Sequence, residues 1–206
     1  MKLGVLISGR GSNLKALLDA RAAGQLAGAE FVVVFSNKPD APGLDYARDA
    51  GIPVESLPSK DFKGRREDFD EEVVGILNRY GCEALVLAGY MRIMTAKLIH
   101  AFPQGIINIH PSLLPAFPGI NAQQQAVDYG AKVSGCTVHF VDEGMDTGPI
   151  ILQQPLAIKP GETGDEFAGR LIAEEHQLLV SGVELLTSGR LRRNGRIVTI
   201  TEESET

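Results

Sequence analysis

Short runs of consecutive apolar residues recur along the first half of the chain and predict buried strands. A strand that is apolar at consecutive positions is covered on both faces. Between these runs, apolar residues at helical spacing predict helices over about 14–21, 44–50 and 69–80. Strands that alternate with helices indicate right-handed βαβ units and a largely parallel sheet. The predicted strands are Leu3–Ile7, Phe31–Phe35, Ala84–Ala88 and Gly105–Ile109.

The pattern changes after residue 130. Two further strands, Val133–Val141 and Ile150–Ile158, are separated by a glycine-rich turn over 142–148, which favours an antiparallel extension. Thr163 and Glu166 form a capping box at the start of a helix that ends near 189. Asn194-Gly195 predicts a small hairpin. The fold class is therefore α/β, with a Rossmann-like, doubly wound, mostly parallel sheet and an antiparallel C-terminal extension.

Length and composition are those of one domain. The chain has 206 residues, of which 44% are hydrophobic, and this supplies enough apolar surface for one sizeable core. Neither a repeat nor a linker divides it. We expect a single domain over 1–206 with a first half of about 1–100, a second half of about 101–190 and a C-terminal hairpin and tail over 191–206, whose last residues fray.

Charge and hydropathy narrow the classes of partner. The net charge is −6, from 20 basic and 26 acidic residues, so neither nucleic acid nor an anionic membrane surface is an expected partner. The longest apolar run, Ala84–Met91, is far shorter than the roughly 20 residues that span a bilayer. No secretory signal begins the chain, so we expect a cytoplasmic protein. Cys82 and Cys136 form neither a disulfide framework nor a metal pattern, and we assign them no chemistry.

A glycine-containing loop, 8–13, follows the first predicted strand and begins a helix. The N–H groups and dipole of such a helix suit an anion, and Gly11 lets the backbone approach it closely, which favours a phosphate site. A dinucleotide fits poorly, because Leu14 stands where a small residue is expected and the second strand ends at Asn37 without a carboxylate. A tight turn with an ordinary Ser or Asn cap remains an equal alternative.

The end of the fourth predicted strand carries the strongest catalytic signal. Asn108 and His110 are two residues apart, so both side chains face the same side at the carboxyl end of the strand. An amide can stabilise an oxyanion and an imidazole can move a proton, so the pair suits addition to a carbonyl group. Pro111 ends the strand, and a stiff apolar segment follows over 113–119, with Pro115 a candidate for a cis bond. The alternative is a capping Asn beside a structural His.

Asp146, in the glycine-rich turn, is a candidate to orient His110 and to favour its charged form, although capping of the loop is an alternative role. The four histidines have no metal-ligand spacing, so no metal is expected. We interpret His139 as a hydrogen-bonded core residue and His100 as a surface residue. Ser112 is outside any Gly-x-Ser-x-Gly turn, which argues against a serine esterase.

Four segments together resemble the folate-dependent glycinamide ribonucleotide (GAR) formyltransferases, and the resemblance covers almost the whole chain. The Asn-x-His and Asp set is shared with other folate formyltransferases and related hydrolases, whereas the Gly-Ser-Asn loop in a compact chain indicates the GAR type. The segments are Ser8–Leu14, Ala88–Ile93, Asn108–Pro115 and Asp142–Ile150.

The resemblance implies the formyltransferase fold and the transfer of a formyl group from the co-substrate 10-formyltetrahydrofolate to the amine of GAR, in purine biosynthesis. It implies that Asn108 and His110 stabilise the tetrahedral intermediate and move protons, with Asp146 supporting His110. The halves of the chain then become a phosphate-binding half and a catalytic and folate half. The implied GAR-binding residues are Gly11, Ser12, Asn13 and Glu175, and the implied folate-binding residues are Arg66, Leu87, Met91, Arg92, Ile93, Met94, Ile106, Asn108, Val141 and Asp142.

Some of these assignments have rivals. Arg65 competes with Arg66 for the folate tail, Met91 and Ile93 can be core residues, and Glu175 can be a surface carboxylate. The segment 121–125 departs from the family pattern, in which histidine or another basic residue is common. The rival functions are a formyltetrahydrofolate hydrolase and a non-catalytic nucleotide-sensing module. We expect small-molecule partners and a monomer or weak homodimer.

Overall fold

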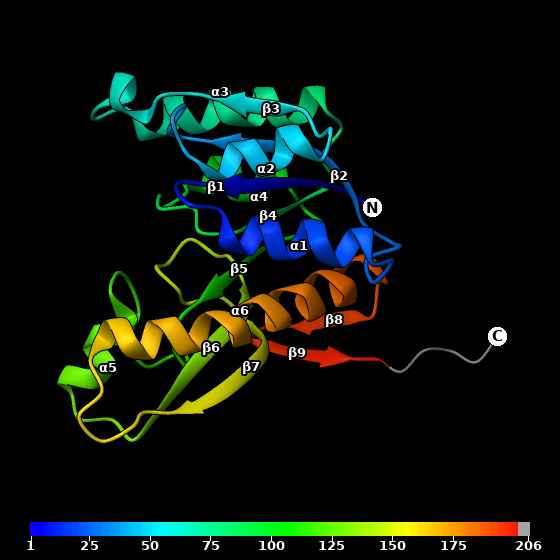
Figure 1. Ribbon diagram of the computed structural model, residues 1–206. Helices are drawn as coiled ribbons and strands as arrows, with labels where there is room; N and C mark the ends of the chain where they lie inside the picture. The colour runs from blue at the N-terminus through cyan, green and yellow to red at the C-terminus, as the bar shows by residue number, and fades with distance from the viewer. Residues whose placement is uncertain (202–206) are drawn as a thin grey trace. The chain divides into compact units, whose positions relative to one another are not determined.

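The computed structural model describes residues 1–201 and contains a seven-stranded sheet with strand order β3-β2-β1-β4-β5-β6-β7, plus a separate two-stranded sheet (Figure 1). The predicted α/β class, with a mostly parallel sheet and an antiparallel C-terminal extension, is confirmed. The chain divides into two compact units, Met1–Ile107 and Asn108–Thr206. The division falls inside β5 (Ile106–His110), and each unit is described separately below.

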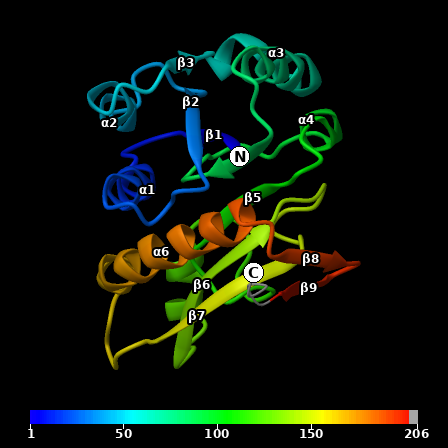
Figure 2. The ribbon, with the colours of Figure 1, turned by 90° about the vertical axis from the view of Figure 1, so that its right-hand side faces the viewer.

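The first unit is built on parallel strands. β1 pairs in parallel with both β2 and β4, and β2 pairs in parallel with β3. Helices lie on both sides of these strands, α1 and α2 on one side and α3 and α4 on the other (Figure 2). Its strands are β1 (Lys2–Ile7), β2 (Glu30–Ser36), β3 (Val54–Ser56) and β4 (Ala84–Leu87), and its helices are α1 (Ser12–Ala22), α2 (Gly43–Asp49), the 3-10 helix η1 (Ser59–Phe62), α3 (Arg66–Arg79) and α4 (Ala96–Ala101).

Coverage on both faces explains the apolar runs of this unit. In β1, Leu3, Val5, Leu6 and Ile7 are fully buried, although their side chains point alternately to opposite faces. The sequence pattern did not predict β3 or α4. β3 has three residues, all at least partly exposed, and α4 has six, so neither is long enough for a clear hydrophobic period.

The junction between β1 and α1 requires glycine. Gly11 has φ 75°, and a Cβ atom built on it would lie 2.6 Å from the Cα atom of Gly43. The Gly43 N–H also donates to the Gly9 carbonyl at 3.0 Å, so the two backbones are in direct contact. Gly11 is the N-cap of α1 and no side chain caps the helix. The alternative of an ordinary Ser or Asn cap is therefore wrong.

Gly11→Ala should destabilise the protein more than Gly24→Ala. Both glycines adopt a left-handed conformation, with φ 75° and 79°, but a Cβ at Gly24 meets nothing within 4 Å. The control should lose about 1–2 kcal/mol of unfolding free energy from the conformation alone, and Gly11→Ala should lose clearly more through the contact with Gly43. Urea unfolding measures both. Equal losses would contradict the close backbone contact.

The second unit is built on an antiparallel pair. β6 and β7 pair antiparallel, with an irregularity between Val138 and His139, and α6 lies along β6 (Figures 1 and 2). The predicted capping box of Thr163 and Glu166 and the predicted hairpin are both confirmed. α5 was not predicted from the sequence. Besides the end of β5, the elements are α5 (Ala122–Asp128), β6 (Val133–Phe140), β7 (Ile150–Ala157), α6 (Gly164–Thr187), β8 (Leu191–Asn194) and β9 (Ile197–Ile200).

Candidate active site

Four polar side chains meet in the second unit. Asn108 and His110 come from the end of β5, His139 from β6, and Asp146 from the turn between β6 and β7. His110 is 4% exposed and His139 is 2% exposed, so neither ring can be solvated freely. Buried groups of this kind must find partners within the protein, and each of the four does.

Asp146 joins the two histidines. Its carboxylate oxygens lie 3.5 Å from Nδ1 of His110 and 3.8 Å from Nε2 of His139. The Gly119 N–H donates to Oδ2 of Asp146 at 2.8 Å, which fixes the carboxylate from the side of the 113–119 segment. Asp146 itself has φ 56°, a conformation that aspartate tolerates better than most residues. The turn thus places the Asp146 carboxylate beside the rings of His110 and His139.

The proton on His139 is located by its neighbours. Nδ1 lies 2.8 Å from the Phe140 carbonyl oxygen, which can only accept, so Nδ1 carries the hydrogen. Burial lowers the pKa of His139 below its ordinary value of 6.5, against the opposing effects of that hydrogen bond and of Asp146. The ring is therefore neutral, and Nε2 accepts a hydrogen bond from Nδ2 of Asn108 at 3.1 Å. Its approach to Asp146 is not an ion pair.

His110 faces an acceptor at each nitrogen. Nε2 lies 2.9 Å from the Phe117 carbonyl oxygen and Nδ1 faces Asp146, so a proton on either nitrogen has a partner. Ser112 supports the same carbonyl, donating its hydroxyl to the Ala116 and Phe117 oxygens at 2.5 and 3.2 Å. The segment also contains the expected cis bond, between Leu114 and Pro115. Either ring nitrogen of His110 can therefore donate a hydrogen bond within the site.

The neutral state of His139 should make stability depend on pH. The unfolded chain protonates this histidine below about pH 6.5, but the native state resists protonation, so the unfolding free energy should fall as the pH drops below that value. His139→Gln removes the titrating ring and should lose less stability between pH 7.5 and pH 5.5 than the unsubstituted protein. Urea unfolding at the two pH values measures this. An identical loss in both proteins would contradict a neutral buried His139.

The candidate phosphate loop lies in the first unit. The first turn of α1 has no capping side chain and no acidic residue, so nothing in it competes with a bound anion. Asn13 is 9% exposed, and among the described residues its Oδ1 has no hydrogen-bond partner. Ser12 is half-buried beside it. Glu175, the candidate ribose ligand, is half-buried on α6 of the second unit.

The candidate folate segment follows β4. Met91 and Ile93 are 71% and 51% exposed, so the alternative that they are core residues is wrong. In contrast, Leu87, Met94 and Ile106 are buried. In the second unit, Val141 is half-buried and Asp142 accepts hydrogen bonds from the Gly144 N–H and the Thr147 hydroxyl at 3.1 and 2.6 Å.

Side chains of α3 and its N-cap residue distinguish the two candidate arginines. Arg66 donates from Nη2 to the Ile93 carbonyl at 3.0 Å, whereas Arg65 pairs with Asp68 and lies over the Phe62 ring. Arg66 is therefore the arginine that contacts the candidate folate segment.

The same helix holds the end of that segment. The carboxylate of Asp70, which is 2% exposed, accepts from the Thr95 N–H at 2.6 Å. The guanidinium of Arg92 packs over the Phe69 ring at 4.1 Å from its centroid. The segment's backbone is thus fixed although two of its apolar side chains face outward.

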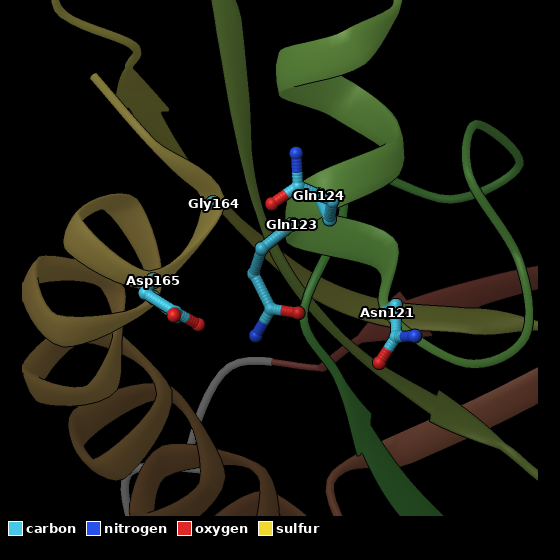
Figure 3. Close-up of a pocket in the computed structure, with 6 residues that line it drawn as sticks. Asn121, Gln123, Gln124, Gly164 and Asp165 are labelled. Carbon is cyan, nitrogen blue, oxygen red and sulfur yellow. The ribbon is translucent and has the colours of Figure 1, made fainter.

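Gln125, in the segment 121–125, supports the backbone next to Asp146. Gln125 donates from Nε2 to the carbonyl oxygens of Pro118 and Ile120 at 3.0 and 2.9 Å, on either side of the Gly119 that contacts Asp146. Its neighbours line a pocket with the start of α6 that contains amides and a carboxylate and no cation (Figure 3). The lining residues are Asn121, Gln123, Gln124, Gly164, Asp165 and Ala168.

Other chemistries find little support in the described residues. Within 1–201, no group of three His, Cys, Asp or Glu side chains is arranged to hold a metal ion. Burial raises the pKa of the Cys136 thiol to about 12 and that of Cys82 to about 11, so both stay protonated near neutral pH. No helix over the same residues is both long and apolar enough to cross a membrane.

Fold and site together define an α/β enzyme with a side-chain set suited to acyl transfer. A family model described as "Formyl transferase" matches residues 1–183. The chain is 38% identical to "Phosphoribosylglycinamide formyltransferase" of Escherichia coli (strain K12), over 93% of this chain and 90% of that protein. The chain therefore belongs to the formyl transferase family.

Two further relatives place it within that family. It is 43% identical, over 98% of its length, to the "Trifunctional purine biosynthetic protein adenosine-3" of Bos taurus, of which it spans only 20%. The crystal structure of glycinamide ribonucleotide transformylase 1 from Symbiobacterium toebii superposes with a TM-score of 0.94 at 44% identity, covering 98% of this chain and 94% of that one. The GAR formyltransferase branch is thus the part of the family that this chain resembles in both sequence and structure.

Proposed function

We propose that this chain transfers the formyl group of 10-formyltetrahydrofolate to the amine of glycinamide ribonucleotide, giving N-formylglycinamide ribonucleotide. The observation that carries the proposal is the buried cluster of Asn108, His110, His139 and Asp146, because it combines an amide donor with a proton carrier. The resemblance to single-function relatives over nearly their whole length supports the choice of acceptor.

The reaction requires an oxyanion to be stabilised and a proton to be moved. The amine attacks the formyl carbon, the carbonyl oxygen becomes an oxyanion, and the carbon–nitrogen bond to the folate then breaks as the amine proton reaches the departing nitrogen. Asn108 has two N–H groups, one of which His139 accepts, so the other is available for the oxyanion. His110 carries the proton and supplies positive charge while it holds it.

Asp146 and His139 keep these two groups in place. Asp146 lies against Nδ1 of His110, where a carboxylate stabilises the ring when it is charged. His139 stays neutral, so it accepts from Asn108 without adding a second positive charge to the cluster. In this proposal His110 carries the proton, and His139 stays neutral and orients Asn108.

The acceptor's phosphate would bind at the N-terminus of α1, to the backbone and side chains of Gly11, Ser12 and Asn13. A helix N-terminus without a capping side chain or an acid has N–H groups to offer, which a chain of net charge −6 needs in order to hold an anion. The resemblance also assigns Glu175, in the second unit, to the ribose hydroxyls.

The donor would bind along 91–94, where exposed Met91 and Ile93 offer apolar surface and the backbone offers hydrogen bonds to a pterin. Arg92 and Met94 complete that segment. The resemblance assigns the buried residues Leu87 and Ile106 to the pterin site. It also assigns Asn108, Val141 and Asp142 of the second unit to folate binding. Arg66, exposed beside Ile93, is the cation for the acidic tail of the folate.

Asn108→Ala and His110→Ala should each lower kcat on the order of 10²-fold or more, because each removes an interaction made with the transition state. Release of tetrahydrofolate in the presence of 10-formyltetrahydrofolate and GAR measures the rate. Ser134→Ala is the control, since its hydroxyl is 1% exposed and has no hydrogen-bond partner among the described residues. Near-normal turnover in either active-site variant would refute the assignment.

The choice of acceptor is tested with the unsubstituted protein. Tetrahydrofolate should appear with GAR and not with water alone or with a sugar-nucleotide amine. Release without any amine would identify a formyltetrahydrofolate hydrolase, and GAR binding without release would identify a sensing module. A cytoplasmic location and a monomer or weak homodimer remain predictions.

A further inference from the structure

A buried hydroxyl follows β1 and connects two segments that are far apart in the sequence. Ser8 is 3% exposed, and its Oγ accepts a hydrogen bond from the Met91 N–H at 2.8 Å. The Ser8 N–H donates to the Gly89 carbonyl at 3.0 Å. Ser8 therefore holds the start of the 91–94 segment through both its backbone and its side chain.

Asn37 determines which way the Ser8 hydroxyl points. The hydroxyl has one hydrogen, which it donates to Oδ1 of Asn37 at 2.5 Å, so a lone pair is left to face Met91. Asn37 is 5% exposed, and its Nδ2 donates to the Ser59 hydroxyl at 3.3 Å, which fixes the orientation of the amide. The amide that stands where a dinucleotide-binding fold has a carboxylate thus makes hydrogen bonds through both its oxygen and its nitrogen inside the first unit.

The two connected segments are the ones assigned to the two substrates. Ser8 is the first residue of the loop 8–13, of which residues 11–13 are proposed for the acceptor's phosphate, and that loop is itself held by the hydrogen bond from Gly43 to Gly9. Met91 begins the segment proposed for the donor, and it has 71% of its surface exposed while its N–H is held from below. The position of the donor segment is therefore defined relative to the phosphate loop.

We propose that Ser8 is a positioning residue for the formyl donor, and that Asn37 acts through Ser8. Ser8 touches neither substrate in this proposal; it fixes the Met91 backbone against which the pterin binds. The inference rests on the proposed function, since it assumes that 91–94 binds the folate. Removal of the hydroxyl leaves the Met91 N–H without its acceptor. Donor binding must then order the segment, and this cost weakens the affinity for the donor.

Ser8→Ala should raise the KM for 10-formyltetrahydrofolate about 10-fold, the factor expected when one hydrogen bond no longer orders the segment, and should change kcat by less than about 3-fold. The Kd of tetrahydrofolate, measured by calorimetry, should rise by a similar factor. The KM for GAR should change much less, because Gly11, Ser12 and Asn13 keep their own supports.

Ser36→Ala is the matched control. Ser36 is fully buried at the end of β2, and its hydroxyl accepts from the Lys38 N–H at 3.0 Å, a contact that stays within its own turn. Ser36→Ala therefore removes an equally buried hydroxyl that makes no contact with the 91–94 segment. Asn37→Ala should reproduce the effect of Ser8→Ala on the donor KM, and the double variant should be no worse than the more affected single variant.

The outcomes separate this inference from the proposed function. If the unsubstituted protein releases no tetrahydrofolate with GAR, the proposed function fails, and the inference that rests on it fails as well. If it is active and Ser8→Ala shifts the donor KM no more than Ser36→Ala, only the inference is overturned. If Ser8→Ala does not fold, Asn37→Ala decides: an unchanged donor KM overturns the inference, and a selective rise supports it.

Discussion

The hydrogen bond from Nδ1 of His139 to the Phe140 carbonyl determines which nitrogen of that ring carries the hydrogen. It leaves Nε2 as an acceptor, and Nε2 in turn orients the amide of Asn108. Because burial keeps this ring neutral, the approach of the Asp146 carboxylate to it is not an ion pair. The orientation of one amide and the tautomer of one histidine thus follow from a single carbonyl group.

Buried side chains also support the irregular segments around the site through hydrogen bonds to the backbone. Backbone outside strands and helices has no ladder of hydrogen bonds, so buried side chains must satisfy it. Ser8 does this for Met91, Asp70 for Thr95, and Asp146 for Gly119. These loops are therefore held in defined positions although their outer side chains face solvent, which is what a pre-organised binding surface requires.

The segment 121–125 supports the active-site cluster from outside it. Gln125 holds the carbonyls that flank Gly119, so the segment contributes to the placement of Asp146 without entering the cluster.

The sequence by itself determined every described strand except β3, the helix capped by Thr163 and the polar pair at the end of β5, because these depend on local periodicity and on side-chain alternation along one strand. It could not decide that Met91 is exposed, or that His139 bonds to Asn108, since both depend on how distant segments pack. The sequence pattern also did not predict short elements such as α5. Only the tertiary structure decided which buried polar groups satisfy one another, because hydrogen bonds between residues far apart in the chain leave no periodic signal in the sequence.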